Sequence, residues 1–183
     1  DLHSFPTRRS SDLNAGQARA QISPVKLSVN KNRKVSQQTT HQNTGGGWDY
    51  YGGYREKKVE EKIYYTVEVA NASTRPVSNV QVRWAILIEP PNGKPQLVEG
   101  ERTCSLNLGQ KFSFDTDLVE LSGTKWETGS GQYRRDVSSK IAGYCVEAFV
   151  DGKRVAGDIQ PADAKRKIDE AREAKDGKKT HQF

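Results

Sequence analysis

The stretch from Lys62 to Glu89 most constrains how this chain can fold, because it repeats with the period of a strand. Every second residue is apolar or aromatic from Ile63 to Val69, and again from Val80 to Ile88. A period of two is typical of a strand that buries one face. β-Branched and aromatic residues, which favour strands, dominate both runs. The residues from Asn71 to Asn79 between them favour a turn, so the sequence predicts two strands with a short link.

Only two positions, Ala85 and Leu87, interrupt the polar face of the second run. Further strand-like runs lie on both sides of this pair. Pro24 at the start of the first run predicts an edge strand, and Asn92-Gly93 indicates a turn. The expected strands are Ile22–Val29, followed by a polar span from Asn30 to Asn43, and then Gln96–Glu99, Thr103–Leu108 and Lys111–Leu121.

The clearest hairpin joins Lys140–Val150 to Lys153–Gln160 through Asp151-Gly152, a dipeptide suited to a two-residue turn with positive φ at both positions. About seven short strands separated by turn signals favour an all-β, antiparallel β-sandwich.

A short C-terminal helix is expected after the last strand. Asp163 can cap a helix over Asp163–Lys175, and Gly177 is a stop signal. Its apolar stripe consists mainly of Ala164, Ile168 and Ala171, with Ala174 at its end. This narrow stripe predicts a helix that docks weakly or remains solvated.

The composition indicates one folded domain with solvated ends. The chain has 183 residues, of which 33% are hydrophobic, and its mean hydropathy is −0.85. We expect the sandwich over residues 22–161, the helix over 162–177 and a disordered tail over 178–183. No run reaches the roughly 18–20 apolar residues of a transmembrane helix.

The first thirteen residues, DLHSFPTRRSSDL, resemble one translated reading frame of a sequencing adapter. We expect residues 1–13 to be an artefact of sequence assembly, which does not belong to the protein. Residues 14–21 then form either a small-residue tail or the remnant of a signal peptide, because Ala18-Arg19-Ala20 has the pattern of a cleavage site. We therefore expect an exported protein, periplasmic or at the cell surface.

The sequence lacks the usual signatures of catalysis, and we expect a protein that is not an enzyme. His41 lies in a polar span and His181 near the end of the sequence, and neither has a strand-to-loop context that could orient it against a serine or cysteine. No glycine-rich loop with a following lysine precedes a helix, which argues against a loop that binds the phosphate groups of a cofactor. Two cysteines are too few for a cysteine zinc site, and we expect no metal and no cofactor.

The two cysteines are unfavourable partners for a disulfide. Cys104 shares parity with Leu106 and Leu108, which predicts an inward side chain. Cys145 has the parity opposite to Tyr144 and Val146, which predicts an outward side chain. A bridge across two sheets would need both to point inward.

The best binding candidates lie in two stretches rich in aromatic residues. The segment 45–54 contains five glycines and four aromatic residues, whose rings can stack on sugars or bases. The same rings could instead cover one end of the core. The long loop expected over Ser122–Ser139 supplies a second group. The candidate ligand-binding residues are Trp48, Tyr50, Tyr51, Tyr54, Trp126, Tyr133, Arg134 and Arg135.

The formal net charge of +6 is spread over the whole chain, so it permits an acidic partner without specifying one. Binding of nucleic acid or another polyanion is a further alternative, which we do not favour. Steep salt dependence would be its signature.

The segment YYTVEVANASTRPVSNVQVRWAILIE, at residues 64–89, resembles the central strands of bacterial immunoglobulin-like and fibronectin-like modules of exported proteins. Leu106–Phe114, LNLGQKFSF, is similar to a later strand of those modules, although their proline is absent here. The resemblance implies an immunoglobulin-like sandwich with a non-catalytic role in protein or cell-envelope contacts. A carbohydrate-binding module that uses the 45–54 loop is the alternative.

Overall fold

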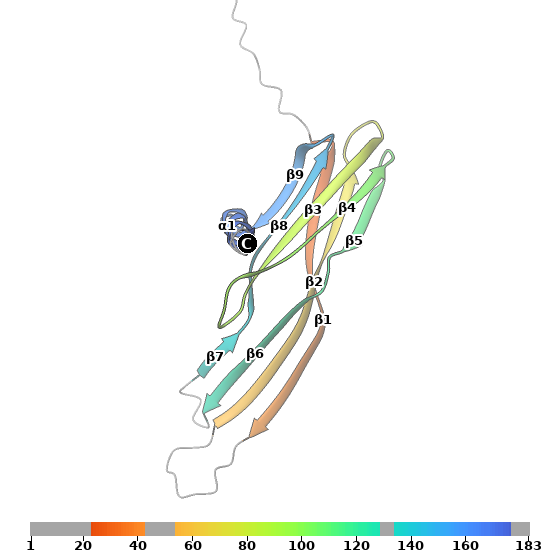
Figure 1. Ribbon diagram of the computed structural model, residues 1–183. Coiled ribbons are helices and arrows are strands. Elements are labelled where there is room, and N and C mark those ends of the chain that lie inside the picture. Colours follow the sequence, from red (N-terminus) through yellow and green to blue (C-terminus); the bar gives the residue numbers. More distant parts are fainter. Residues whose placement is uncertain (1–22, 43–53, 129–133, 177–183) are drawn as a thin grey trace, which may run out of the picture.

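The computed structural model describes residues 23–42, 54–128 and 134–176, which form a β-sandwich with one helix (Figure 1). All strand pairs are antiparallel. The described residues contain nine strands, two more than expected. In chain order the elements are β1 (Val25–Gln42), β2 (Tyr54–Asn71), β3 (Val77–Glu89), β4 (Gln96–Leu106), β5 (Lys111–Asp115), β6 (Val119–Thr128), β7 (Arg134–Ser138), β8 (Lys140–Val150), β9 (Lys153–Gln160) and α1 (Ala164–Asp176).

The strands form two sheets. The first has five strands in the order β1-β2-β6-β7, with β5 also paired to β2, and the second has four strands in the order β4-β3-β8-β9. The two strands predicted around the link at Asn71 are both present, one in each sheet. The link therefore carries the chain from one layer to the other, and the sequence pattern alone did not show this.

The core lies between the two sheets and contains the residues that the alternating pattern predicted to point inward. The inward residues of β2 from Ile63 to Val69 and those of β3 from Val80 to Ile88 are all buried. Trp84 lies at the centre, with its ring centroid 5.2 Å from that of Phe114. Tyr65 and Tyr144 pack ring to ring across the two sheets, with centroids 4.8 Å apart.

Asn71 secures the corner where the chain changes sheets. Its side-chain amide donates to the backbone carbonyls of Arg75 (2.8 Å), Asn107 (3.0 Å) and Leu106 (3.3 Å). Its Oδ1 accepts from the backbone N–H of Ser73 at 2.8 Å. One buried amide thus ties the link to the turn that follows β4.

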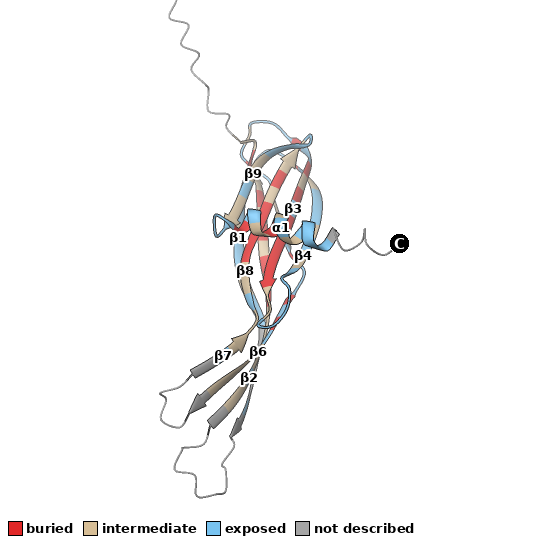
Figure 2. Ribbon diagram, turned by 60° about the vertical axis from the view of Figure 1, so that its left-hand side comes forward, coloured by how far each residue is buried: buried red, intermediate tan, exposed pale blue. Residues whose placement is uncertain are grey.

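The helix is docked on the sheet, so of the two expected alternatives the solvated helix is wrong. Ala164 and Ile168 are fully buried, and α1 lies across the outer face of the second sheet (Figure 2). Ile168 packs in a cluster with Ala85, Leu87 and Cys145. This cluster explains why Ala85 and Leu87 interrupt the polar face of β3: both faces of that strand are covered.

Three strand predictions were wrong in where the strands begin or end. β1 continues to Gln42 through the expected polar span, because its backbone pairs with β2 along its whole length. The runs Gln96–Glu99 and Thr103–Leu108 belong mainly to one strand, β4. The run Lys111–Leu121 is interrupted near Thr116, whose backbone N–H donates to the Tyr65 carbonyl at 2.9 Å and whose hydroxyl accepts from the Tyr65 N–H at 3.0 Å.

The expected long loop Ser122–Ser139 is instead largely a pair of strands, in which β6 pairs with β7. The β8–β9 hairpin is as predicted, with φ of 50° at Asp151 and 74° at Gly152. The first strand does lie at a sheet edge, as Pro24 indicated. Among the described residues, no helix is long and apolar enough to cross a membrane.

Candidate binding site

The first sheet extends beyond the second and forms a projection that we call the arm (Figures 1 and 2). The sandwich ends near the row that pairs Ile63 with Arg33 and Val119. Beyond this row the arm is one layer thick among the described residues. It comprises the strand segments Val35–Gln42, Tyr54–Lys62, Glu120–Thr128 and Arg134–Ser138.

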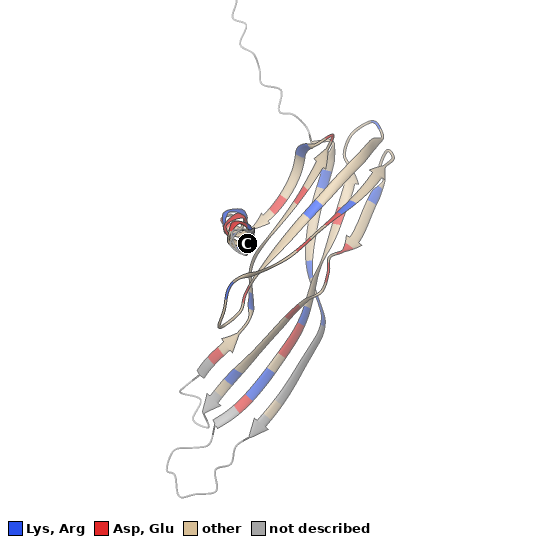
Figure 3. Ribbon diagram, viewed as in Figure 1, with Lys and Arg blue, Asp and Glu red and all other residues tan. Residues whose placement is uncertain are grey.

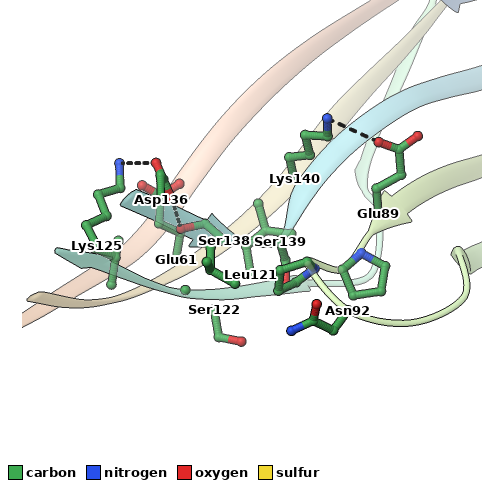
Figure 4. A pocket seen from close by; sticks show the side chains of 15 residues that line it. Glu61, Glu89, Asn92, Leu121, Ser122, Lys125, Asp136, Ser138, Ser139 and Lys140 are labelled. Carbon is green, nitrogen blue, oxygen red and sulfur yellow. Dashed lines mark hydrogen bonds and ion pairs between the residues drawn. The ribbon is translucent and has the colours of Figure 1, made fainter. Parts of the chain in front are cut away.

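A cleft of about 670 Å³ lies at the base of the arm (Figure 4). Its lining comes from the two sheets, because the arm contributes β2, β6 and β7 while the β3–β4 turn and the start of β8 contribute the rest. The lining residues include Val59, Glu61, Leu121, Lys125, Asp136 and Ser138 from the arm, Glu89 at the end of β3, Asn92 in the β3–β4 turn, Ser139 just before β8 and Lys140 at its start. Such a volume suits a small ligand or a few side chains of a partner.

Ion pairs surround the cleft. Lys125 Nζ lies 3.2 Å from Asp136 Oδ2, and Lys140 Nζ lies 3.3 Å from Glu89 Oε2. The Ser138 hydroxyl donates to Asp136. This hydrogen bond, with the nearby Lys125 ammonium, holds the pKa of Asp136 below its ordinary value, although partial burial opposes the shift. Asp136 is therefore charged at neutral pH, and the cleft offers both signs of charge together with hydroxyl groups.

Gly123 allows β7 to approach β6 at the cleft. A β-carbon at this position would overlap the Ser138 side chain and lie 2.6 Å from the Ser138 Cα. Because Gly123 has no side chain, the Ser138 side chain can lie against the Gly123 backbone, and from there its hydroxyl bonds to Asp136. This is a packing reason for glycine within a strand.

The opposite face of the arm is also polar, and Figure 3 marks the charged residues along the strands of the arm. Lys62 Nζ and Glu120 Oε1 are 2.5 Å apart on neighbouring strands. Lys58, Glu60 and Ser122 are exposed. A single-layer sheet that bears charges on both faces can remain in water without a covering layer, so the arm is accessible without presenting a large apolar surface.

The structure places some of the predicted ligand-binding residues and leaves others outside the described residues. Trp48, Tyr50, Tyr51 and Tyr133 lie outside them. Tyr54 begins β2, where it pairs with Thr128, and Arg135 on β7 pairs with Trp126 on β6. The strands that flank both aromatic segments therefore end side by side at the far end of the arm.

The cleft residues were missed by the sequence patterns. Lys125, Asp136 and Ser138 fall in a segment without apolar alternation, so its strands gave no period-two signal. Gly129-Ser130-Gly131 near the middle of the segment was the available sign of a hairpin. Glu89 and Lys140, which are far apart in sequence, face each other only in the folded chain.

Among the described residues, the ionisable groups with the most strongly raised pKa values lie in the body of the protein and not in the cleft. Burial raises the pKa of Tyr65 to about 12. Burial, followed by the nearby Glu147, raises the pKa of Cys145 to about 11. Within the described ranges no group of three or more His, Cys, Asp or Glu side chains is placed to hold a metal ion.

Cys104 and Cys145 are both free thiols. Both lie in the second sheet, on β4 and β8, so they cannot form the bridge between two sheets that the sequence raised. Cys104 packs against the core, whereas Cys145 packs under α1 on the opposite face of that sheet.

The fold and the cleft define a two-sheet β-sandwich with a projecting, polar arm. No family model matches the chain, and no curated protein matches its sequence. A structural genomics target designated SoR45 is similar at 13% identity over 67% of this chain and 86% of its own, with a TM-score of 0.32. A protein from Akkermansia muciniphila is 11% identical over 77% of this chain and 75% of its own, with a TM-score of 0.27. A protein from Bordetella pertussis is 14% identical over 66% of this chain and 94% of its own, with a TM-score of 0.28.

Proposed function

We propose that this chain is a non-catalytic interaction module of the immunoglobulin-like kind, carried by an exported bacterial protein. Its partner is a protein or another component of the cell envelope. The observation that carries the proposal is the arm, a sheet layer uncovered among the described residues and joined to the body at a charged cleft. Apart from Leu121 next to the body, the arm contributes no side chain to the core cluster among the described residues, so recognition of a partner is the role it suits best.

The chemistry of the arm favours a polar and reversible contact. Obligate interfaces are typically apolar, whereas the arm bears ion pairs on both faces, such as Lys125–Asp136 and Lys62–Glu120. Ser138 and Ser139 add hydroxyl groups at the cleft. We therefore place the contact with the partner at the cleft and the adjoining face of the arm.

A charge swap at the cleft tests this role. Binding of the full chain to isolated envelope fractions of the source bacterium is compared for Lys125→Asp, Asp136→Lys and the double variant. The double variant keeps an ion pair with reversed direction, so it separates recognition from stability. We expect all three variants to bind at least tenfold more weakly, a change of about 1.4 kcal/mol.

The matched control reverses another exposed ion pair, Arg83–Glu101, on the second sheet and away from the arm. The variant Arg83→Glu/Glu101→Arg should bind as the unchanged chain does. Full binding by the double variant at the cleft would contradict the proposed site. Absence of any binding to the envelope fractions would contradict the proposed function.

A carbohydrate-binding role is the second candidate, and the pairing of Tyr54 with Thr128 favours it, because it brings the flanks of the two aromatic segments together. A glycan array tests this role with Trp48→Ala, which should abolish binding while the charge swap at the cleft does not. Binding to a polyanion such as nucleic acid would instead weaken steeply with salt.

A further inference from the structure

A second hollow, distinct from the cleft, lies between α1 and the β3–β4 hairpin. Its volume is about 760 Å³, and it is lined by apolar side chains from both elements. Leu87 and Leu97 come from the sheet, while Ala171 and Ala174 come from the helix. We call this hollow the helix groove.

The helix groove exists because the apolar stripe of α1 becomes smaller along the helix. Ile168 fills the space over Ala85 and Leu87. One turn later the side chains are only Ala171, which is half-buried, and Ala174, which is exposed. Two methyl groups cannot fill the space above Leu97, so apolar surface stays open to an apolar ligand.

The rim of the helix groove carries three lysines, Lys94, Lys167 and Lys175, and two glutamates, Glu89 and Glu170. Lys94 from the hairpin and Lys175 from the last helical turn line it, and neither forms an ion pair with any described residue. The acidic residues of the lining are already paired: Glu89 with Lys140 at 3.3 Å and Glu170 with Arg166 at 2.6 Å.

We propose that the helix groove binds a single-chain amphipathic carboxylate, of the class of a free medium-chain fatty acid. The acyl chain lies against Leu97 and Ala171, beside the buried Leu87, where each buried methylene contributes about 0.8 kcal/mol. The carboxylate lies at the rim, where Lys94 and Lys175 supply charge-assisted hydrogen bonds. The volume is in the range of small-molecule sites, which are mostly apolar with a few polar groups.

The test is titration of the full chain with decanoate below its critical micelle concentration, followed by NMR of the Leu87 and Leu97 methyl groups. Decanol, which has the same chain without the charge, is titrated in parallel. Lys94→Gln/Lys175→Gln should weaken decanoate binding roughly tenfold and leave decanol binding unchanged. Lys26→Gln/Lys153→Gln removes two exposed lysines elsewhere and should change neither.

Ala174→Leu fills the helix groove from an exposed position, so the protein should fold as before, which an unchanged melting temperature verifies. This variant should bind both decanoate and decanol more weakly than the unchanged chain does. The proposal is overturned if decanoate leaves the two leucines unperturbed, or if it binds Ala174→Leu as tightly as the unchanged chain. Shifts of these methyl groups on dilution of the protein alone would assign the groove to a second copy and also overturn it.

Discussion

Gly100 on β4 lies directly opposite Trp84 on β3, and the indole of Trp84 packs against the Gly100 backbone. A β-carbon at Gly100 would lie 2.7 Å from Trp84 Cε2, and closer still to Cζ2. An aromatic ring that covers a glycine on an edge strand replaces the packing that the missing side chain would provide. The position of the central tryptophan therefore depends on a glycine in the neighbouring strand.

Replacing Gly100 by Ala should destabilise the protein by about 1–3 kcal/mol, because the ring of a buried tryptophan has to move. Urea denaturation measures the change. Gly157→Ala is the matched control, since an added methyl group there meets the far end of the exposed Arg154 side chain, which can turn away. Equal losses in both variants would show that the effect is not specific to Trp84.

Replacing Ile168 by Ala should expose Cys145 while leaving Cys104 as it is. Ile168 and Cys145 pack in one cluster under α1, whereas Cys104 belongs to the core on the other face of the sheet. The loss of a buried Ile side chain costs about 2–5 kcal/mol, which loosens the helix first. Alkylation followed by peptide mass spectrometry measures the modification rate of each thiol. An equal increase in the rates of both cysteines would indicate general unfolding and contradict local opening.

Replacing Asn71 by Asp should destabilise the protein at neutral pH. A carboxylate there faces the carbonyl oxygens of Arg75, Leu106 and Asn107 without a hydrogen to donate. Leaving buried partners unsatisfied costs about 1–3 kcal/mol, and more for a charged group. Urea denaturation of the variant measures this loss at neutral pH.

The surroundings of residue 71 should raise the pKa of the new carboxyl in the folded state above its unfolded value of about 3.9. The variant should therefore regain stability as pH falls through that raised pKa, because the protonated group can donate again. Asn79→Asp, at an exposed position, should cost little at any pH. A deficit at residue 71 that does not change with pH would argue against the proposed repulsion.

Replacing Tyr65 by Phe should make the protein less sensitive to alkaline pH. Burial raises the pKa of Tyr65 from 10.0 to about 12 in the folded state. Between these values the unfolded chain loses the proton more readily, so the free energy of unfolding falls as pH rises. The Phe variant lacks this contribution, and its stability should fall less steeply over that range. Urea midpoints at several pH values test this, and identical slopes would contradict it.

The period of two in β2 and β3 was sufficient to predict the core, because burial of one sheet face imposes that alternation directly on the residues. The Asp151-Gly152 turn was predictable for a similar reason, since few residues tolerate positive φ at both positions. The arm was not predictable. Its strands are held by backbone pairing between polar segments, which leaves no apolar pattern in the sequence.

The sequence by itself determined the strand class, the inward face of the central pair, the β8–β9 hairpin and the helix at the C-terminal end. Only the tertiary structure decided that β2 and β3 lie in different sheets, that α1 covers Ala85 and Leu87, and that Lys125 and Asp136 meet at the cleft. The physical reason is how far apart in sequence the interacting residues lie. Alternation and turn preferences act between residues close in sequence, whereas the cleft and the helix groove arise where segments far apart in sequence come together.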